Sequence, residues 1–170
     1  AESALAWQQA GAEPEQVHLN DLLAEPGRIA GFDAIMFIGG FSYGDYMSSG
    51  HVFGHRVRHH LRAQLEDFIG GGGLVMGVCN GFQVMTKIGL LPGLDGDYFT
   101  PRVALMQNDG GTFQNFWVNL RFEADSPCIF TRGLGTMELP IRHGEGKLFT
   151  LDDSLLQRLE DEGCVAVRYA

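Results

Sequence analysis

The segment that most constrains the fold is a short apolar run that ends in a glycine-bounded turn around a cysteine. Residues 74–76 are apolar, Gly77 follows them, and Cys79 stands two residues later, with Gly81 close behind. An apolar run bounded by glycine is typical of a buried strand, and residues 82–88 read as the start of a helix. The segment therefore predicts a strand, a tight turn and a helix in direct succession.

A turn of this kind matches a nucleophile elbow, which exposes one reactive side chain between a strand and a helix. Gly77 and Gly81 leave the space that such a turn needs. Cys79 would then lie at a helix N-terminus, where the helix dipole and free N–H groups favour a thiolate. The alternative interpretation is a buried structural cysteine, which is the usual environment of this residue type.

Composition limits the classes of protein that remain. A chain of 170 residues with 45% hydrophobic residues fits one globular domain, spanning residues 1–170. The net charge of −9 leaves no basic stripe for nucleic acid, and no apolar stretch reaches the length of a membrane span. Three scattered cysteines form neither a disulfide framework nor a metal cluster. We therefore expect a cytoplasmic protein with no nucleic-acid partner, no membrane contact and no metal.

The order of predicted elements indicates an α/β protein with a doubly wound, mostly parallel sheet. The predicted helices are 2–10, 52–69, 82–88 and 153–162, and the predicted strands are 16–19, 34–38, 74–77, 103–107, 116–122, 137–142 and 164–169. Five apolar residues recur at helical spacing along one face of the second helix, namely Phe53, Val57, Leu61, Leu65 and Phe68. Fully apolar strands that alternate with helices favour a sheet covered on both faces.

Two loops should meet in such a sheet. Functional loops lie at the carboxyl ends of parallel strands, and both the glycine-rich segment 39–50 and Cys79 fall there. Acyl transfer by a cysteine needs a base and donors for the tetrahedral oxyanion. The backbone N–H groups of Asn80 and Gly40 are the expected donors.

Three motifs in this order resemble a known family. Gly77-Val78-Cys79-Asn80-Gly81-Phe82-Gln83 resembles the nucleophile motif of class I glutamine amidotransferases. Gly39-Gly40-Phe41-Ser42-Tyr43-Gly44-Asp45 and His143-Gly144-Glu145-Gly146 narrow the resemblance to the glutaminase parts of phosphoribosylformylglycinamidine synthases. The resemblance extends from about residue 2 to residue 170.

The resemblance implies both a fold and an activity. The fold would be the flavodoxin-like, three-layer class I amidotransferase fold. The activity would be hydrolysis of glutamine to glutamate and ammonia, and the ammonia would pass to a synthetase domain or subunit. That partner would use ATP and Mg, whereas this domain would need no cofactor. The nucleophile would be Cys79, the oxyanion donors Gly40 and Asn80, and the substrate-pocket residues Phe41, Gln83, His143, Gly144 and Glu145.

The catalytic base is open to two interpretations. His143 and Glu145 have the spacing of a base with an orienting carboxylate, so they are candidates for a catalytic triad. In the family, however, the triad His and Glu come from a later His-Pro-Glu motif, and the His-Gly-Glu-Gly element is a separate pocket loop. The sequence reaches Ala170 without that motif. The chain also begins in a helix without methionine, so we expect an excerpt that lacks its first strand and its C-terminal segment, and that is nearly inactive if nothing follows.

Other interpretations remain. The chain could be a catalytically incomplete interaction or regulatory domain on the same scaffold, or, less specifically, another cysteine-elbow hydrolase or chaperone. His51, His55 and His59 recur four residues apart and predict a solvated helix face rather than a zinc site, because the H-E-x-x-H signature is absent. Gln114 and Phe116 stand where the family commonly has an acidic residue and an arginine, so the contribution of that strand to the pocket is open.

Overall fold

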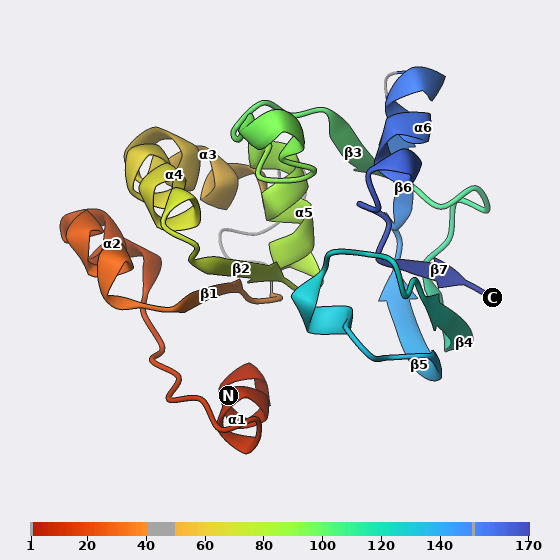
Figure 1. Cartoon of the computed structure of the whole chain (residues 1–170), viewed down its shortest axis with the longest axis horizontal. Coiled ribbons are helices and arrows are strands. Elements are labelled where there is room, and N and C mark those ends of the chain that lie inside the picture. The colour runs from red at the N-terminus through yellow and green to blue at the C-terminus, as the bar shows by residue number, and fades with distance from the viewer. Residues whose placement is uncertain (1, 41–49, 151) are drawn as a thin grey trace.

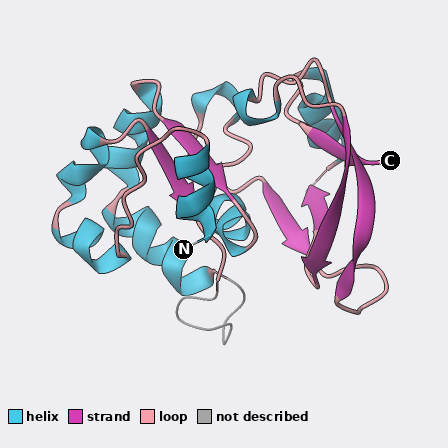
Figure 2. Cartoon of the chain, turned by 90° about the horizontal axis from the view of Figure 1, so that it is seen from below, coloured by secondary structure: helices cyan, strands magenta, loops and turns pink. Residues whose placement is uncertain are grey.

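The computed structural model describes residues 2–40, 50–150 and 152–170. They form a mixed α/β protein in which the strands gather in two groups (Figures 1 and 2). One group is a parallel pair of strands among helices, and the other consists of antiparallel strands beside it. None of the described helices is long and apolar enough to cross a membrane.

The helical half of the molecule is built on the parallel pair β1 (Ala34–Phe37) and β2 (Leu74–Gly77). Three helices, α3 (His51–His60), α4 (Arg62–Gly70) and α5 (Asn80–Ile88), lie on one side of this pair (Figure 1). Two short helices, α2 (Leu19–Ala24) and the 3-10 helix η1 (Pro26–Gly31), complete this half. Its core is made of buried side chains from these elements and the turn after α5: Leu19, Ile29, Phe37, Val57, Leu61, Leu65, Phe68, Val84, Met85, Ile88, Leu90 and Phe99.

The N-terminal helix α1 (Glu2–Gln9) lies on the opposite side of the parallel pair (Figure 1). It has no buried residue, and it contacts the rest of the protein through Trp7. The indole Nε1 of Trp7 donates to Met36 Sδ at 3.1 Å, and the Trp7 ring meets Phe130 edge-on. This face of the sheet is thus covered far more lightly than the face toward α3–α5.

The strands after Pro101 pair antiparallel. β3 (Val103–Met106) pairs with β6 (Lys147–Thr150), while β4 (Gln114–Phe122) lies between β5 (Thr136–His143) and β7 (Val167–Tyr169). The helix α6 (Asp153–Asp161) packs here through a second, small core of Leu94, Val103 and Leu159. The short 3-10 helices η2 (Leu94–Gly96) and η3 (Ile129–Thr131) connect these elements.

Several predicted elements are confirmed and others are wrong. The five apolar residues of the predicted helix 52–69 do face the core, but the helix is two helices, because the backbone leaves helical geometry at Leu61 (φ −121°, ψ 4°). The predicted strand 16–19 is absent: Leu19 begins α2, and the ring of His18 caps that helix by accepting from Asn20 N. The prediction also missed β6, and of the described strand pairs only β1–β2 is parallel.

An ion-pair cluster fastens β7 to its neighbours. Arg168 donates from Nε to Glu123 at 2.8 Å and pairs through its terminal nitrogens with Glu160 of α6. Hydrogen bonds from Arg168 hold the pKa of Glu160 below its ordinary value, and bonds from Arg121 and then Arg168 lower the pKa of Glu123. The cluster holds Tyr169, the next residue, in place beside β4.

Substitution Arg168→Gln tests this cluster. Carboxylates with a lowered pKa in the folded state stabilise the protein above their ordinary pKa, and this contribution is lost as the pH falls through the lowered value. We expect Arg168→Gln to lower the melting temperature at pH 7 by no more than a few degrees, since exposed ion pairs are weak. The difference from wild type should shrink below about pH 4.5, the ordinary value for glutamate. A difference that stays constant from pH 7 to pH 3 would contradict this assignment.

Candidate active site

Cys79 occupies a strained turn between β2 and α5. Its backbone has φ 55° and ψ −121°, and it stands at the N-cap of α5. Positive φ is uncommon for a residue with a side chain, and such strain persists only where the surrounding structure holds it. Cys79 is nonetheless exposed. The strand, turn and helix predicted from the sequence are therefore present, and the alternative of a buried structural cysteine is wrong.

Glycines make this turn possible, because their missing side chains leave room for backbone contacts. A Cβ on Gly81 would lie 1.9 Å from the carbonyl oxygen of Phe37, and a Cβ on Gly77 would lie 2.5 Å from Met85 Sδ. Since real Cβ atoms do not approach other atoms so closely, the first turn of α5 packs against the end of β1 only with glycine at position 81.

The parallel pairing of β1 and β2 brings two of the predicted loops together. Phe37 is the register partner of Gly77, so both strands end at the same edge of the sheet. A Cβ on Gly39 would lie 3.1 Å from Cys79 Cβ and 3.6 Å from its sulfur. Gly40 follows with φ 102°, a conformation that favours glycine. Phe41 and the rest of that motif through Asp45 lie outside the described residues.

Of the two predicted oxyanion donors, Asn80 directly follows Cys79, and Gly40 directly follows Gly39, which packs against the Cys79 side chain. The neighbouring amides are used internally: Val78 N donates to Phe37 O, Gly81 N to Val78 O, and Gln83 N to Cys79 O. Among described residues, the N–H groups of Asn80 and Gly40 have no acceptor. Free N–H groups beside a nucleophile are what an oxyanion hole requires, and their role here stays a prediction.

His143 lies at the end of β5 in a loop organised by Asn108. The Asn108 Nδ2 group donates to the carbonyl oxygens of Thr112 and His143, each at 2.9 Å. Its Oδ1 therefore accepts, from Gly146 N at 3.2 Å and from the ring Nδ1 of His143 at 2.9 Å. The Asn108 backbone N–H donates to Gly144 O at 2.9 Å. One asparagine thus shapes the whole His-Gly-Glu-Gly turn.

These hydrogen bonds determine which nitrogen of the His143 ring donates and which can accept. Because Nδ1 donates to Asn108, a neutral ring has Nε2 free to accept, and Nε2 lies 3.3 Å from the hydroxyl of Tyr169. Neither ring nitrogen is hydrogen-bonded to Cys79. Glu145 is half-buried. The pocket and triad roles considered for His143 and Glu145 both stay predictions, but the ring is engaged elsewhere in this structure.

Asn108 is the residue that sequence reasoning missed. It directly precedes Asp109-Gly110-Gly111, a composition typical of turns, so the turn could be anticipated but its distant hydrogen-bond partners could not. Gln83 is half-buried and its side chain lies beside Asn80. The side chain of Gln114 donates to the nearby Thr112 hydroxyl at 3.2 Å, and Phe116 is half exposed.

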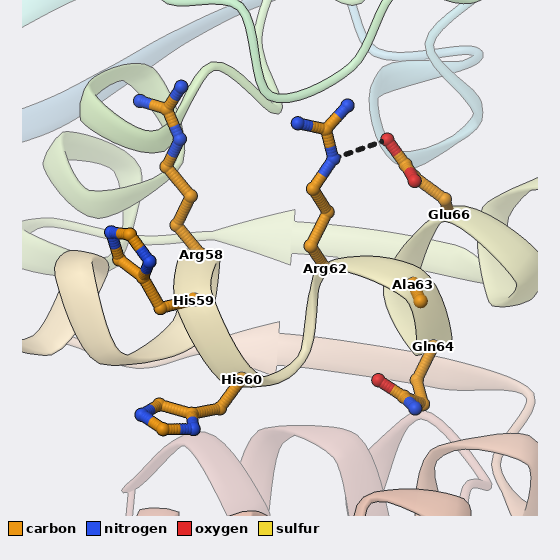
Figure 3. A pocket seen from close by; sticks show the side chains of 7 residues that line it. All are labelled: Arg58, His59, His60, Arg62, Ala63, Gln64 and Glu66. Carbon is orange, nitrogen blue, oxygen red and sulfur yellow. Dashed lines mark hydrogen bonds and ion pairs between the residues drawn. The ribbon is translucent and has the colours of Figure 1, made fainter.

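A separate open depression of about 660 Å³ lies at the junction of α3 and α4 (Figure 3). It is lined by two arginines, two histidines and three other residues: Arg58, His59, His60, Arg62, Ala63, Gln64 and Glu66. Arg62 pairs with Glu66 at 2.9 Å and stacks over the Phe99 ring. His51, His55 and His59 are exposed, as predicted, and the described residues contain no cluster of three metal-binding side chains. None of the residues that line the depression belongs to the elbow.

Comparison with known proteins adds independent information. A family model described as a CobB/CobQ-like glutamine amidotransferase domain matches residues 1–170. Phosphoribosylformylglycinamidine synthase subunit PurQ of Methanococcus maripaludis is 41% identical over 168 residues, which are 99% of this chain and 61% of the relative. The subunit PurQ of Dehalococcoides mccartyi is 43% identical over 149 residues, which are 86% of this chain and 57% of the relative.

A solved structure is also similar to this chain. The structure of PurLQS from Thermotoga maritima matches with a TM-score of 0.70 and 30% identity, covering 99% of this chain and 68% of the matched chain. This chain spans about three fifths of the length of the two PurQ relatives. Since the family model covers every residue of it, the chain belongs to the CobB/CobQ-like glutamine amidotransferase domain family.

Proposed function

We propose that this chain is the glutaminase part of a phosphoribosylformylglycinamidine synthase, which hydrolyses glutamine and supplies ammonia for purine biosynthesis. The observation that carries the proposal is the exposed Cys79 in a strained turn of positive φ, with Gly39 packed against it. Membership of the amidotransferase family and the identity to PurQ subunits support it. The finer fold, a doubly wound, flavodoxin-like sheet that includes β1–β2, belongs to the same proposal.

The chemistry would proceed through a thioester. The Cys79 thiolate attacks the side-chain amide carbon of glutamine, and the N–H groups of Gly40 and Asn80 stabilise the resulting oxyanion. The C–N bond breaks once the leaving nitrogen is protonated, which releases ammonia and leaves a glutamyl thioester. Water then attacks the thioester, releasing glutamate and restoring the thiol. The Gln83 side chain and the His143–Glu145 backbone would lie near the bound glutamine.

The proton donor and base of these steps would be the histidine of a His-Pro-Glu motif, as in related amidotransferases. His143 is the other candidate, although its two ring nitrogens contact Asn108 and Tyr169. The partner would be a synthetase domain or subunit that uses ATP and Mg, and the related structure is of PurLQS. A cytoplasmic location belongs to the same proposal.

A chloroketone analogue of glutamine tests the assignment. In the complete protein that carries this chain, the Cys79 thiolate should displace chloride and form a thioether, which peptide mapping detects. Cys164 serves as an internal control, because burial and then the nearby Glu162 raise the pKa of its thiol and make it less reactive. Excess free glutamine should protect Cys79. Labelling of Cys128 or Cys164 with Cys79 unmodified would instead favour the catalytically incomplete domain.

A further inference from the structure

The side chain of Asn80 has a position that its backbone role does not explain. Asn80 follows the exposed Cys79 directly, yet only 4% of its surface is accessible. A buried amide needs hydrogen-bond partners, because leaving one unsatisfied is costly. Its partners come from both ends of the glycine-rich segment that follows β1.

The hydrogen-bond partners identify each terminal atom of the Asn80 amide. One atom lies 3.1 Å from the carbonyl oxygen of Gly40, which can only accept, so this atom is the nitrogen. The other atom lies 3.3 Å from Gly50 N, which can only donate, so it is the oxygen. The nearest terminal atom of the Gln83 side-chain amide lies 3.1 Å from the same oxygen, and it donates there only when that amide is also turned so that its nitrogen takes this position. In this orientation both ends of the Asn80 amide are satisfied.

The backbone of Gly50 lies close to the Asn80 side chain. A Cβ on Gly50 would lie 3.5 Å from both terminal atoms of the Asn80 amide and 2.6 Å from Val84 Cγ2. Gly50 also has φ 71° and is the N-cap of α3. The asparagine therefore joins three parts of the site that are separate in sequence: the start of the segment after β1, the N-cap of α3 and the turn at Cys79.

We propose that the Asn80 side chain is a positioning residue that orients the Gly40 backbone for catalysis. Its bond to Gly40 O restrains a glycine whose φ of 102° is otherwise weakly constrained. The N–H of Gly40 belongs to the peptide that joins it to Gly39, the residue packed against the Cys79 side chain. Restraining Gly40 would therefore hold this peptide, which adjoins the residue packed against Cys79, in one orientation before substrate arrives. The inference rests on the proposed glutaminase function.

Asn80 would then have two separate roles. The Asn80 backbone N–H would contact the oxyanion, whereas its side chain would act only through Gly40. A donor that is not held in place must be reorganised during the reaction, and this lowers the rate of the chemical step. A bond that merely stabilised the fold would instead change stability, and it would leave the kcat of the folded enzyme unaltered.

Asn80→Asp discriminates between these roles. The carboxylate has nearly the same shape and can still accept from Gly50 N, but it cannot donate to Gly40 O. In the complete enzyme with its synthetase, we expect kcat for glutamine hydrolysis to fall about 10- to 100-fold, while KM stays within about threefold. Alkylation of Cys79 by iodoacetamide, which needs no oxyanion hole, should keep its rate in Asn80→Ala, which adds no charge beside the thiolate. Asn80→Ala removes the same bond without adding a charge, and it replaces the aspartate if that variant does not fold.

Thr86→Val is the matched control. Thr86 lies on the same helix and is 1% exposed, and its hydroxyl donates at 2.9 Å to Gln83 O rather than to Gly40 O. Its kcat should match wild type even where its melting temperature is lowered as much as that of the Asn80 variants. Wild-type kcat in folded Asn80→Asp and Asn80→Ala, or equal kcat losses in Thr86→Val, would overturn the positioning role. A wild-type enzyme that neither hydrolyses glutamine nor reacts with the chloroketone at Cys79 would overturn the proposed function itself.

Discussion

Replacement of Cys79 by serine is expected to reduce glutamine hydrolysis by about three orders of magnitude or more. A serine hydroxyl is protonated at neutral pH and is a much weaker nucleophile than a thiolate. The fold should not change, because the Cys79 side chain is exposed and only the sulfur is replaced by oxygen. Ammonia release by the complete enzyme measures the effect, and the melting temperature verifies the fold.

The other two cysteines provide the controls for this experiment. Cys128 and Cys164 are also unpaired, so Cys128→Ser and Cys164→Ser change the same atom away from the elbow. Both should retain glutaminase activity within about twofold. ATP-dependent synthesis with added ammonia should survive in Cys79→Ser, because under the proposed function that step would belong to the synthetase partner. Glutamine-dependent activity that persists in Cys79→Ser would rule out the thioester mechanism.

Replacement of Gly81 by alanine is expected to have the largest effect on stability. The new Cβ would lie 1.9 Å from Phe37 O and 2.4 Å from Phe37 C, both atoms of a strand backbone. A side chain can rotate out of such a clash, but here β1 or α5 must move, which disrupts the core between them. The cost should be about 4 kcal/mol or more, so the variant should unfold at a much lower denaturant concentration or fail to fold.

Gly70→Ala is the corresponding control. Gly70 is the last residue of α4, and a Cβ there meets no other atom within 4 Å. Alanine also has a higher helix propensity than glycine. Its free energy of unfolding should therefore stay within about 0.5 kcal/mol of wild type. Similar stabilities for the two variants would show that α5 and β1 are not in the close contact described here.

The elbow could be predicted because its determinants are local. The apolar runs that form β1 and β2 end in glycine, and Gly77 and Gly81 flank Cys79 at the spacing that a strand-to-helix turn needs. The buried stripe from Phe53 to Phe68 could also be predicted from the sequence, because residues at helical spacing lie on one face whether or not the helix is continuous.

The errors come from features that lack such a local signal. Leu61 is apolar, like its neighbours on the buried stripe, so the helix break at that residue leaves the pattern unchanged. Gln16–Leu19 is short, and the ring of His18 made it a helix cap instead of a strand. Parallel and antiparallel pairing depend on which strands meet, and a strand sequence does not state its partner.

For the candidate site, the sequence pattern predicted the elbow with Cys79 as the candidate nucleophile, the glycines around it and the family. How those residues are held in place could be seen only in the folded protein. Asn80 reaches Gly40 and Gly50 because β1 and β2 run parallel and end together, and Asn108 shapes the turn of His143 across 35 residues of sequence. Spacing along a chain encodes turns and helix faces, whereas hydrogen bonds between distant segments exist only after the strands have paired.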